Sequence, residues 1–541
     1  MAPARPLLFK NGRILSKAEV GLDGKPTFAE SMIVKDGVIQ AIGSHEELIK
    51  LQTEDGYETR DLQGKTVLPG FVDGHMHLLL LGQALRKVGL EHCKSLDDIL
   101  TTLRKYAKEN PDVPRICAKG WMHSMTPDGV DSTLLDDIDP RPIFVDTKDL
   151  HSIWTNSAGL AEMGLDNMPD PAGGTIQRDE NGKPSGVLNE GAVLTIGWPH
   201  LARVATLQER IDCMLAAFEA YNASGYTGLV EMAMDEQAWD ALVELKRRHP
   251  DAPMRIVAYW LIKPADNEAE RMRQVEKAIE LSREFNKDAS PDLRIAGIKV
   301  ICDGIIDACT SYLSEPYAVA PSPPPIWTKE HLDPVVKRAA EAGVQIALHA
   351  IGDAAIRMAV DMLEKHTKPG GRHRIEHLEL ASPEDAKRLG ELGLTASIQP
   401  VHADPAILRA WPRLIGEDRC GRAFAYREFA DAGALMALGS DSPTAPWNPL
   451  HNIYVAATRR SAREPESDEV VNEHFRLGVC ESVVAGTAGA AASVFLDDRV
   501  GSLAAGKMAD FVVVDMEWEA TSLLKAEMKE TWFSGKKVWS S

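Results

Sequence analysis

The chain has 541 residues, of which 44% are hydrophobic and 26% are charged, and its formal net charge is -20 at pH 7. This length exceeds one simple core, so we expect either two domains or one large barrel with additions. The acidic balance argues against nucleic acid or an anionic membrane as a partner, because a negatively charged surface repels both. No window reaches the roughly 18 uninterrupted apolar residues of a membrane span.

The cysteine content and the N-terminus bear on the compartment. The first residues, "MAPARPLLFKNGRIL", contain neither a long apolar core nor a cleavage site, so we expect no signal peptide. The seven cysteines are scattered, odd in number and form no CxxC pair. This usage is typical of a reduced compartment, and we expect a cytoplasmic protein. A homodimer is a candidate assembly.

Short strands and turns are predicted at both ends of the chain. The first segment reads "LLFKNGRIL", "SMIVKDGVIQAIG" and "TRDLQGKTVLPG", in which Asn11-Gly12 and Asp36-Gly37 are typical hairpin turns between apolar runs. The last segment has the same character, with "MADFVVVD" followed by "ETWFSGKKVW".

The middle of the chain alternates between strands and helices. Strand-like runs such as "MRIVAYWLI", "RIAGIKVICDG" and "VQIALHAIGD" are separated by helical patterns such as "NEAERMRQVEKAIELSREF" and "TKEHLDPVVKRAAEAG". Such alternation predicts a parallel sheet, and about eight units predict a closed (β/α)₈ barrel. The segment from about 82 to 200 interrupts the alternation and reads as an insertion, in which "GGTIQRDENGKPSGVL" predicts a hairpin.

The predicted barrel strands end in side chains that are suited to metal binding. In "FVDGHMHLLL" the two histidines are two residues apart, so in a strand both imidazoles point to the same side. A single histidine at such a place is more often a packing residue than a ligand, but six side chains at the same end of successive strands favour a shared site. Imidazole and carboxylate together suit zinc or a similar divalent ion. The six residues are His75, His77, Lys299, His349, His377 and Asp441.

Lys299 is the unusual member of this set, because a protonated amine cannot bind a cation. Burial lowers the pKa of a lysine, and a neutral amine can capture carbon dioxide as a carbamate whose oxygens bridge two metals. The alternative is an unmodified lysine paired with Asp303. Glu231, in "LVEMAMD", is a further strand-end carboxylate that could line the pocket, replace the lysine as the bridge, or simply pack.

Motifs along nearly the whole chain resemble one family. They are "LPGFVDGHMHL", "IWTNSAGL", "GIKVICDG", "HAIGDAAI", "HRIEHLEL", "ASIQPVHADP", "GSDSPTAPWNPL" and "GSLAAGKMADFVVVD". In this order they resemble the amidohydrolase superfamily and, within it, amidohydrolase family 3, the branch that includes N-substituted formamide deformylases and the YtcJ-like hydrolases.

The resemblance implies a metal centre and an architecture. It implies that His75 and His77 bind one metal, that His349 and His377 bind a second, and that a carbamylated Lys299 bridges them. Asp441 would be both a ligand and a proton shuttle. The cofactor would be zinc or another divalent metal, with one or two ions per chain. The fold would be a TIM-like (β/α)₈ barrel over residues 69–491, interrupted by the insertion at about 82–200. The strand-rich ends, residues 1–68 and 492–541, would pair into one small β-sandwich.

The chain departs from the family at two places where substrate is expected to bind. Ser442 stands where many relatives have tryptophan in "SDWP", and Leu150-His151 stands where they have a glycine-histidine pair.

We therefore expect a hydrolase that cleaves a C–N bond in a small amide, N-acyl or N-formyl compound with a metal-activated hydroxide. His402 or His151 would help to polarise the carbonyl group, and Asp441 would carry the proton to the leaving nitrogen. The same centre could instead act on an ester, a carbamate or a cyclic amide. A non-catalytic scaffold is the alternative from another class, but such a protein would be expected to have lost ligands.

Overall fold

The computed structural model describes residues 5–51, 56–148, 151–171 and 174–541. The chain divides into two compact units, which are described separately. The larger unit consists of Met1–Leu78 and Ala217–Ser541, and the smaller unit is Leu79–Ala216.

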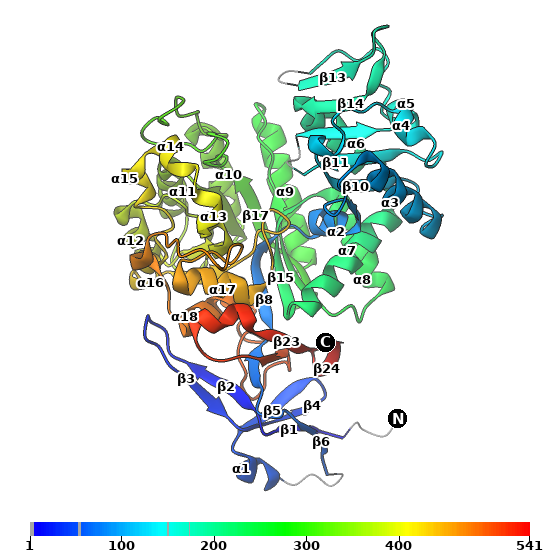
Figure 1. Cartoon of the computed structure of the whole chain (residues 1–541). Helices are drawn as coiled ribbons and strands as arrows, with labels where there is room; N and C mark the ends of the chain where they lie inside the picture. Colours follow the sequence, from blue (N-terminus) through cyan, green and yellow to red (C-terminus); the bar gives the residue numbers. More distant parts are fainter. Residues whose placement is uncertain (1–4, 52–55, 149–150, 172–173) are drawn as a thin grey trace. The chain divides into compact units, whose positions relative to one another are not determined.

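Eight parallel strands, paired in the order in which they occur along the chain, form the central sheet of the larger unit (Figure 1). Their runs of β-branched and aromatic residues are buried, as expected for strands that are covered on both faces. The strands are β8 (Phe71–Met76), β15 (Tyr226–Met234), β16 (Arg255–Leu261), β17 (Leu293–Ile301), β18 (Gln345–Ala350), β19 (Arg374–His377), β20 (Thr395–Ile398) and β21 (Leu435–Leu438). The predicted TIM-like barrel is confirmed.

Helices follow the barrel strands and pack against them, for example α9 on β17 and α11 on β18. The side chain of Thr328 caps α10 by accepting a hydrogen bond from the backbone N–H of His331. The principal helices are α8 (Glu236–Arg248), α9 (Glu268–Glu284), α10 (Lys329–Glu341), α11 (Asp353–His366), α12 (Pro383–Glu391), α16 (Tyr426–Asp431), α17 (Pro449–Thr458), α18 (Val479–Val484) and α19 (Ala490–Ser493). Shorter turns are η3 (Pro400–Ala403), α13 (Pro405–Leu408), α14 (Trp411–Ile415), α15 (Glu417–Cys420), η4 (Glu473–Phe475) and η5 (Ala485–Gly489).

Close backbone approach joins the first and last barrel strands. The backbone N–H of Asp441 donates to the carbonyl oxygen of His75 at 2.7 Å. A Cβ atom on Gly439 would lie 2.5 Å from the backbone nitrogen of His75, and one on Gly74 would lie 2.6 Å from the carbonyl oxygen of Leu438. Only glycine fits at such distances, and this approach is what places the two strand ends side by side.

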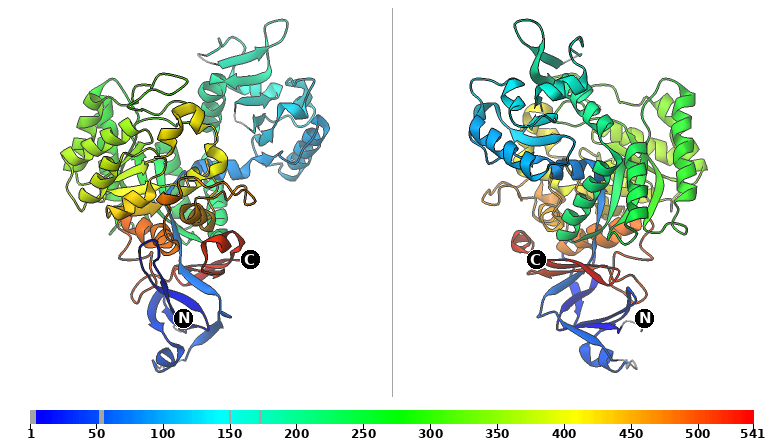
Figure 2. Two further views of the ribbon diagram at one scale, coloured as in Figure 1. Left: turned by 60° about the vertical axis from the view of Figure 1, so that its left-hand side comes forward. Right: turned by 90° about the vertical axis from the view of Figure 1, so that its right-hand side faces the viewer.

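Both ends of the chain contribute to a β-sandwich in the larger unit, which the sequence predicted and the fold confirms. Figure 2 shows strands from the two ends, blue and red, lying together. One sheet contains β5 (Val38–Gly43), β4 (Ser31–Lys35), β1 (Leu7–Lys10) and β6 (Glu58–Asp61), with α1 (His45–Ile49) following β5 in the chain. The other contains β24 (Lys536–Ser540), β23 (Glu527–Phe533), β22 (Phe511–Asp515), β7 (Thr66–Pro69), β2 (Arg13–Ala18) and β3 (Pro26–Ala29), and η6 (Ala520–Lys525) precedes β23.

One of the two predicted hairpins in this region is wrong. Asp36-Gly37 joins β4 and β5, which pair antiparallel as expected. Asn11-Gly12 joins β1 and β2, which belong to different sheets and do not pair. The turn carries the chain from one sheet to the facing one, so Phe9 and Ile14 on either side of it are buried in the same core.

The smaller unit is built around a mixed six-stranded sheet of its own. The sheet order is β13 (Gly174–Arg178), β14 (Pro184–Glu190), β12 (Ser152–Thr155), β11 (Ile143–Thr147), β10 (Ile116–Trp121) and β9 (Val88–Gly89). The predicted hairpin is β13 and β14, although its first residue, Gly173, lies outside the described residues. The helices are α3 (Leu96–Glu109), η1 (His123–Met125), α4 (Thr133–Asp136), α5 (Ser157–Met163), η2 (Val193–Gly197) and α6 (Trp198–Val204). Two helices, α2 (Leu78–Arg86) and α7 (Leu207–Ala223), contain the points where the chain passes between the units. The exact limits of the sandwich, barrel and insertion stay a prediction.

Across the described residues, none of the helices has the length and apolar character that crossing a membrane requires.

Candidate metal centre

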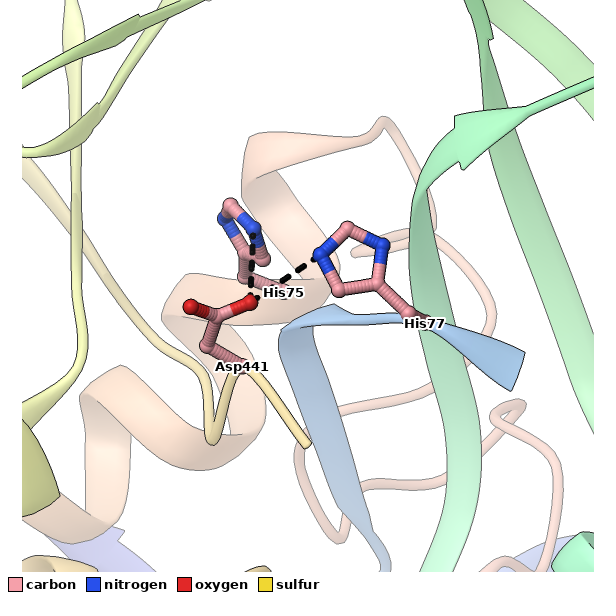
Figure 3. A group of neighbouring side chains, drawn as sticks. All are labelled: His75, His77 and Asp441. Atoms are coloured by element: carbon pink, nitrogen blue, oxygen red, sulfur yellow. Dashed lines mark ion pairs between the residues drawn. The ribbon is translucent and has the colours of Figure 1, made fainter. Parts of the chain in front are cut away.

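The two histidines at the end of β8 point at one carboxylate (Figure 3). The Nε2 atoms of His75 and His77 lie 3.4 Å and 3.1 Å from Oδ1 of Asp441. His75 is almost fully buried, whereas His77 and Asp441 keep a small exposed area. Two imidazoles and one carboxylate with their ligating atoms this close are a three-ligand set of the kind that holds zinc.

A second group of ligating atoms lies beside the first. His377, Glu379 and His402 bring one nitrogen or oxygen each to within 4.8 Å of one another. Nδ1 of His402 is 3.4 Å from Oε1 of Glu379, and its Nε2 is 3.7 Å from Oδ2 of Asp441. The rings of His377 and His402 are parallel, with centroids 5.9 Å apart. His402 thus connects the second group to the first.

His349 and Lys299 lie close to the same residues. The ring of His349 is 4.4 Å from that of His377, which is in turn 4.8 Å from that of His75. Lys299 is 2% exposed. Asp303 accepts backbone hydrogen bonds from Tyr312, Ile351 and Gly352. The carboxylate that was the alternative partner for Lys299 is therefore already engaged by the backbone.

Buried polar atoms without partners show that the site fits a cation. Among the described residues, two atoms of this site that can accept a cation, Nδ1 of His377 and Oδ1 of Asp441, are buried and make no hydrogen bond. Leaving such groups unsatisfied is costly, so a partner of complementary chemistry is expected at the site. Nitrogen and carboxylate-oxygen donors match zinc or a similar divalent ion.

Burial sets the protonation of most of these groups. Burial, followed by the charge of Lys299, lowers the pKa of His75 to about 4, and burial lowers that of His349 to about 3. Both imidazoles are therefore neutral at pH 7, the form that binds a metal. Burial also lowers the pKa of Lys299. Burial acts in the same direction on His77, but the neighbouring carboxylates of Asp441 and Glu231 outweigh it and raise its pKa to about 9.

Glu231, for which the sequence left three roles open, lies beside His77. Its Oε2 accepts a short hydrogen bond from the backbone N–H of Leu78, at the start of α2. Its Oε1 lies 3.8 Å from Nδ1 of His77. Glu231 therefore faces the ring nitrogen of His77 that points away from Asp441.

Ser442 is fully buried, and its Oγ lies 2.6 Å from the hydroxyl oxygen of Tyr221. The same hydroxyl donates to Asp73 at 2.9 Å, and Asp73 accepts from the backbone N–H of His75 and of Ser440. Ser442 is thus part of a network that joins the ends of β8 and β21.

His151 lies in the smaller unit. Its Nδ1 is 2.8 Å from Oε2 of Glu190, and both side chains are about 60% exposed. The part expected of His151 in catalysis stays a prediction. Leu150, the other half of that departure from the family pattern, lies outside the described residues. Trp121 and Trp154, two large aromatic residues of the insertion, are buried in the core of the smaller unit.

Two functional candidates were missed by sequence reasoning. Glu379 lies two residues after His377, and its position in "HLEL" at a strand end was an available signal. Glu376 contacts His75 across 301 positions of sequence, and nothing in the local pattern indicates that contact.

Comparison with known proteins shows which family the chain resembles. A family model described as "Amidohydrolase family" matches residues 58–539. The chain is 28% identical to Protein LONG AFTER FAR-RED 3 of Arabidopsis thaliana, over 98% of this chain and 91% of that protein. It is 30% identical to the putative amidohydrolase YtcJ of Bacillus subtilis, over 94% and 96% of the two chains. It is 24% identical to N-substituted formamide deformylase of Arthrobacter pascens, over 96% and 94%.

A solved structure of a metal-dependent hydrolase has the same fold as this chain. The crystal structure of an uncharacterized metal-dependent hydrolase from Pyrococcus furiosus superposes with a TM-score of 0.78 at 25% identity, covering 95% of this chain and 99% of that one. The fold and the candidate ligand groups together support a metal-dependent hydrolase. The chain belongs to the amidohydrolase family.

Proposed function

We propose that the protein hydrolyses a C–N bond in a small amide, N-acyl or N-formyl compound. The observation that carries the proposal is the position of Asp441, whose Oδ1 faces both histidines of the β8 pair while its Oδ2 faces His402. One carboxylate therefore borders both the metal ligands and a second titratable group.

His75, His77 and Asp441 would hold the first ion. When bound, the divalent metal supplies a Lewis acid that polarises a carbonyl oxygen and lowers the pKa of water from 15.7 to about 7. Oδ1 of Asp441 would face the ion, and Oδ2, the oxygen that faces His402, would accept the proton that water loses. His402 reaches Asp441 from the other side at 3.7 Å and offers a hydrogen bond to the substrate carbonyl or a further position for that proton.

The need to protonate a leaving nitrogen favours C–N cleavage. An amine is a poor leaving group unless it receives a proton, and Asp441 with His402 can hold one beside the reacting carbon. The relative from Arthrobacter pascens, named N-substituted formamide deformylase, supports the same chemistry. An ester needs this assistance less, and ester, carbamate or cyclic-amide hydrolysis remains the second candidate.

Matched substrate pairs test the proposal. The zinc-loaded protein should be assayed with N-substituted formamides and N-acyl amines, each beside the formate or acyl ester of the corresponding alcohol. We expect turnover of at least one amide at a kcat/KM that exceeds that of its ester, after correction for the uncatalysed rates. Turnover of esters or carbamates alone would overturn the C–N assignment and leave the hydrolase class intact.

Two arrangements are proposed for a second ion, and both include His377. In the first, His349 is the other histidine and a carbamylated Lys299 bridges the two ions, which the unpartnered and buried amine supports. In the second, Glu379 and His402 complete the set with His377. Zinc is the metal that we propose for either arrangement, because these ligands suit it.

The cysteines support a reducing compartment. All seven are free thiols. We therefore propose a cytoplasmic protein, since an oxidising compartment favours pairing. Homodimerisation stays a prediction that sedimentation can test.

A further inference from the structure

A buried carboxylate lies directly behind the first metal ligand. Oε2 of Glu376, in β19, lies 2.7 Å from Nδ1 of His75. At most 1% of either side chain is exposed. A carboxylate accepts hydrogen bonds, so the neutral imidazole places its proton on Nδ1. The lone pair then lies on Nε2, the atom that faces Asp441 at 3.4 Å. Two acceptors face each other across this gap, as they do when a cation lies between them.

Arg374 fixes the orientation of Glu376. Its Nε donates to Oε1 of Glu376 at 2.8 Å, and its Nη2 lies 3.2 Å from Oε2. Its other N–H groups donate to the carbonyl oxygen of Gly74 at 2.6 Å, to Oγ of Ser397 at 2.8 Å and to Oγ of Ser493 at 2.6 Å. The arginine thus binds the residue directly before His75, the neighbouring strand β20 and the end of α19.

Stability alone does not account for this arrangement. The cost of desolvating a buried Arg–Glu pair often equals or exceeds its Coulombic gain, so apolar residues of the same volume would serve a core at least as well. Here Glu376, the carboxylate of the pair, also contacts Nδ1 of His75, a candidate metal ligand. A carboxylate on the outer nitrogen of a metal-bound histidine fixes its tautomer and orientation and raises its affinity for the ion.

We propose that Glu376, oriented by Arg374, is a positioning residue that holds His75 as the Nδ1–H tautomer and thereby sets the affinity of the first metal position. The inference rests on the proposed function in one respect, namely that His75 binds the metal. Neither Glu376 nor Arg374 touches the substrate in this role.

The chain supplies a matched control. Glu481, in α18, is 3% exposed and forms a two-point ion pair with Arg427 at 2.8 Å and 2.7 Å. It also accepts the backbone N–H of Gly478, at the start of α18. This buried Arg–Glu pair has no imidazole partner, so Glu481→Gln measures the structural cost of changing such a pair.

The experiment measures zinc affinity directly, by competition with a chromophoric chelator. The proteins are wild type, Glu376→Gln, Glu481→Gln and His75→Ala. Glutamine has one acceptor oxygen where glutamate has two, so it cannot satisfy Arg374 and the Nδ1–H of His75 in the same way. We expect the Kd for zinc of Glu376→Gln to rise by about 10- to 100-fold. Glu481→Gln should bind zinc as wild type does.

A spectroscopic readout separates positioning from a general loss of stability. The visible d–d bands of the cobalt(II)-loaded protein should differ between Glu376→Gln and wild type and be the same in Glu481→Gln. Wild-type affinity together with a wild-type cobalt spectrum in Glu376→Gln would overturn the inference. If Glu376→Gln does not fold, Arg374→Lys takes its place, because lysine keeps the charge but not the paired hydrogen bonds. An unchanged zinc affinity in that variant would equally overturn it.

Failure of the proposed function has a different signature. If wild type binds no zinc, or if His75→Ala binds it as tightly as wild type, the metal position itself is wrong. If His75→Ala loses zinc and Glu376→Gln keeps both the wild-type affinity and the wild-type cobalt spectrum, only the positioning role is wrong.

Discussion

At the residue scale, we propose two roles for Asp441, metal ligand and proton carrier. Its two oxygens face different partners, the β8 histidines on one side and His402 on the other. Asp441→Asn keeps the size and one ligating oxygen but removes the basicity. We expect the variant to retain most of its metal and to lose turnover by about 10²- to 10⁴-fold, the usual contribution of general acid–base catalysis. Elemental analysis and steady-state kinetics on the same sample measure both quantities.

The contradictory outcome for Asp441 is equally definite. Near-normal turnover of Asp441→Asn in excess zinc would make Asp441 a ligand only. The proton would then have to travel through another group, and His402 is the first to test.

The two arrangements proposed for a second ion predict different losses. His349→Ala removes a ligand from one arrangement, and Glu379→Gln removes a ligand from the other while keeping the shape of the side chain. If Glu379 and His402 hold the ion, Glu379→Gln should fall to about one zinc per chain and His349→Ala should keep two. The reverse pattern supports the bridge through Lys299. Elemental analysis after dialysis against dilute zinc gives the counts, and two ions in both variants would contradict both arrangements.

Part of this site could be predicted from sequence because ligands at strand ends carry a local signal. His75, His77 and Asp441 follow apolar runs that read as strands, and parallel strands bring such ends together. The position of Glu379 after a strand-end histidine is a weaker signal, and Glu376 carries none, since an acidic residue next to a histidine is common at surfaces. Their roles depend on which strand faces which, and that is determined by packing across hundreds of residues.

His373, at the other end of β19, should make stability depend on pH. Burial lowers its pKa to about 4, and its Nδ1 accepts the backbone N–H of Ile346. The unfolded chain binds a proton below its ordinary pKa of about 6.5, whereas the folded chain does so only near pH 4. The stability that this neutral histidine contributes is therefore complete above pH 6.5 and is lost as pH falls towards 4, by up to about 3 kcal/mol.

The comparison with His373→Asn isolates this contribution. Asparagine offers an oxygen to the same N–H and does not titrate. Between pH 6.5 and 4 the free energy of unfolding should fall less steeply in the variant than in wild type, as measured by denaturant titration at several pH values. Parallel profiles would refute the assignment.

At the scale of elements, the strands could be predicted from sequence, but the connections that carry the chain from one sheet to another could not. Runs such as "RIVAYWL" become β16 because β-branched and aromatic residues are buried on both faces of the sheet. Asn11-Gly12 has the composition of a hairpin turn, yet it connects two sheets. Turn chemistry fixes the reversal of the chain, whereas the core shared by Phe9 and Ile14 decides which strand becomes the partner.

The contact between β8 and β21 brings together His75 and Asp441, two of the candidate metal ligands. A methyl group at Gly439 would lie 2.5 Å from the backbone nitrogen of His75 and would force the two strand ends apart. We expect Gly439→Ala to lower the free energy of unfolding by about 1–3 kcal/mol. It should also weaken zinc binding, because His75 and Asp441 move relative to each other. Denaturant titration and chelator competition measure the two effects.

Gly486→Ala serves as the control for this element. The added methyl group would meet nothing closer than the ring of Phe71 at 3.6 Å, an ordinary contact. Stability and zinc affinity should stay close to those of wild type. Equal effects of the two substitutions on stability and zinc affinity would contradict a specific role for the contact between β8 and β21.

At the scale of the whole larger unit, the two ends of the chain depend on each other for a core. Residues Val67 and Val513 are paired in adjacent strands, and the ring of Phe9 lies 5.1 Å from both Phe511 and Trp532. Asp510 makes a short ion pair with Arg255 at the first residue of β16. The sandwich therefore cannot close until the last residues have been synthesised.

A chain that ends at Val500 tests this dependence. It lacks β22, β23 and β24, so β7 loses one of its two neighbouring strands and the core around Phe9 is exposed. An open sheet edge beside an exposed apolar face promotes aggregation, and we expect this protein to be insoluble. A chain that ends at Gly535 is the control, because it lacks only β24, an edge strand whose residues are exposed or half-buried. We expect the control to be soluble and to bind zinc as the full chain does, as measured by the soluble fraction and by elemental analysis. A soluble, zinc-binding chain that ends at Val500 would show instead that the barrel and the N-terminal strands fold without the C-terminal half of the sandwich.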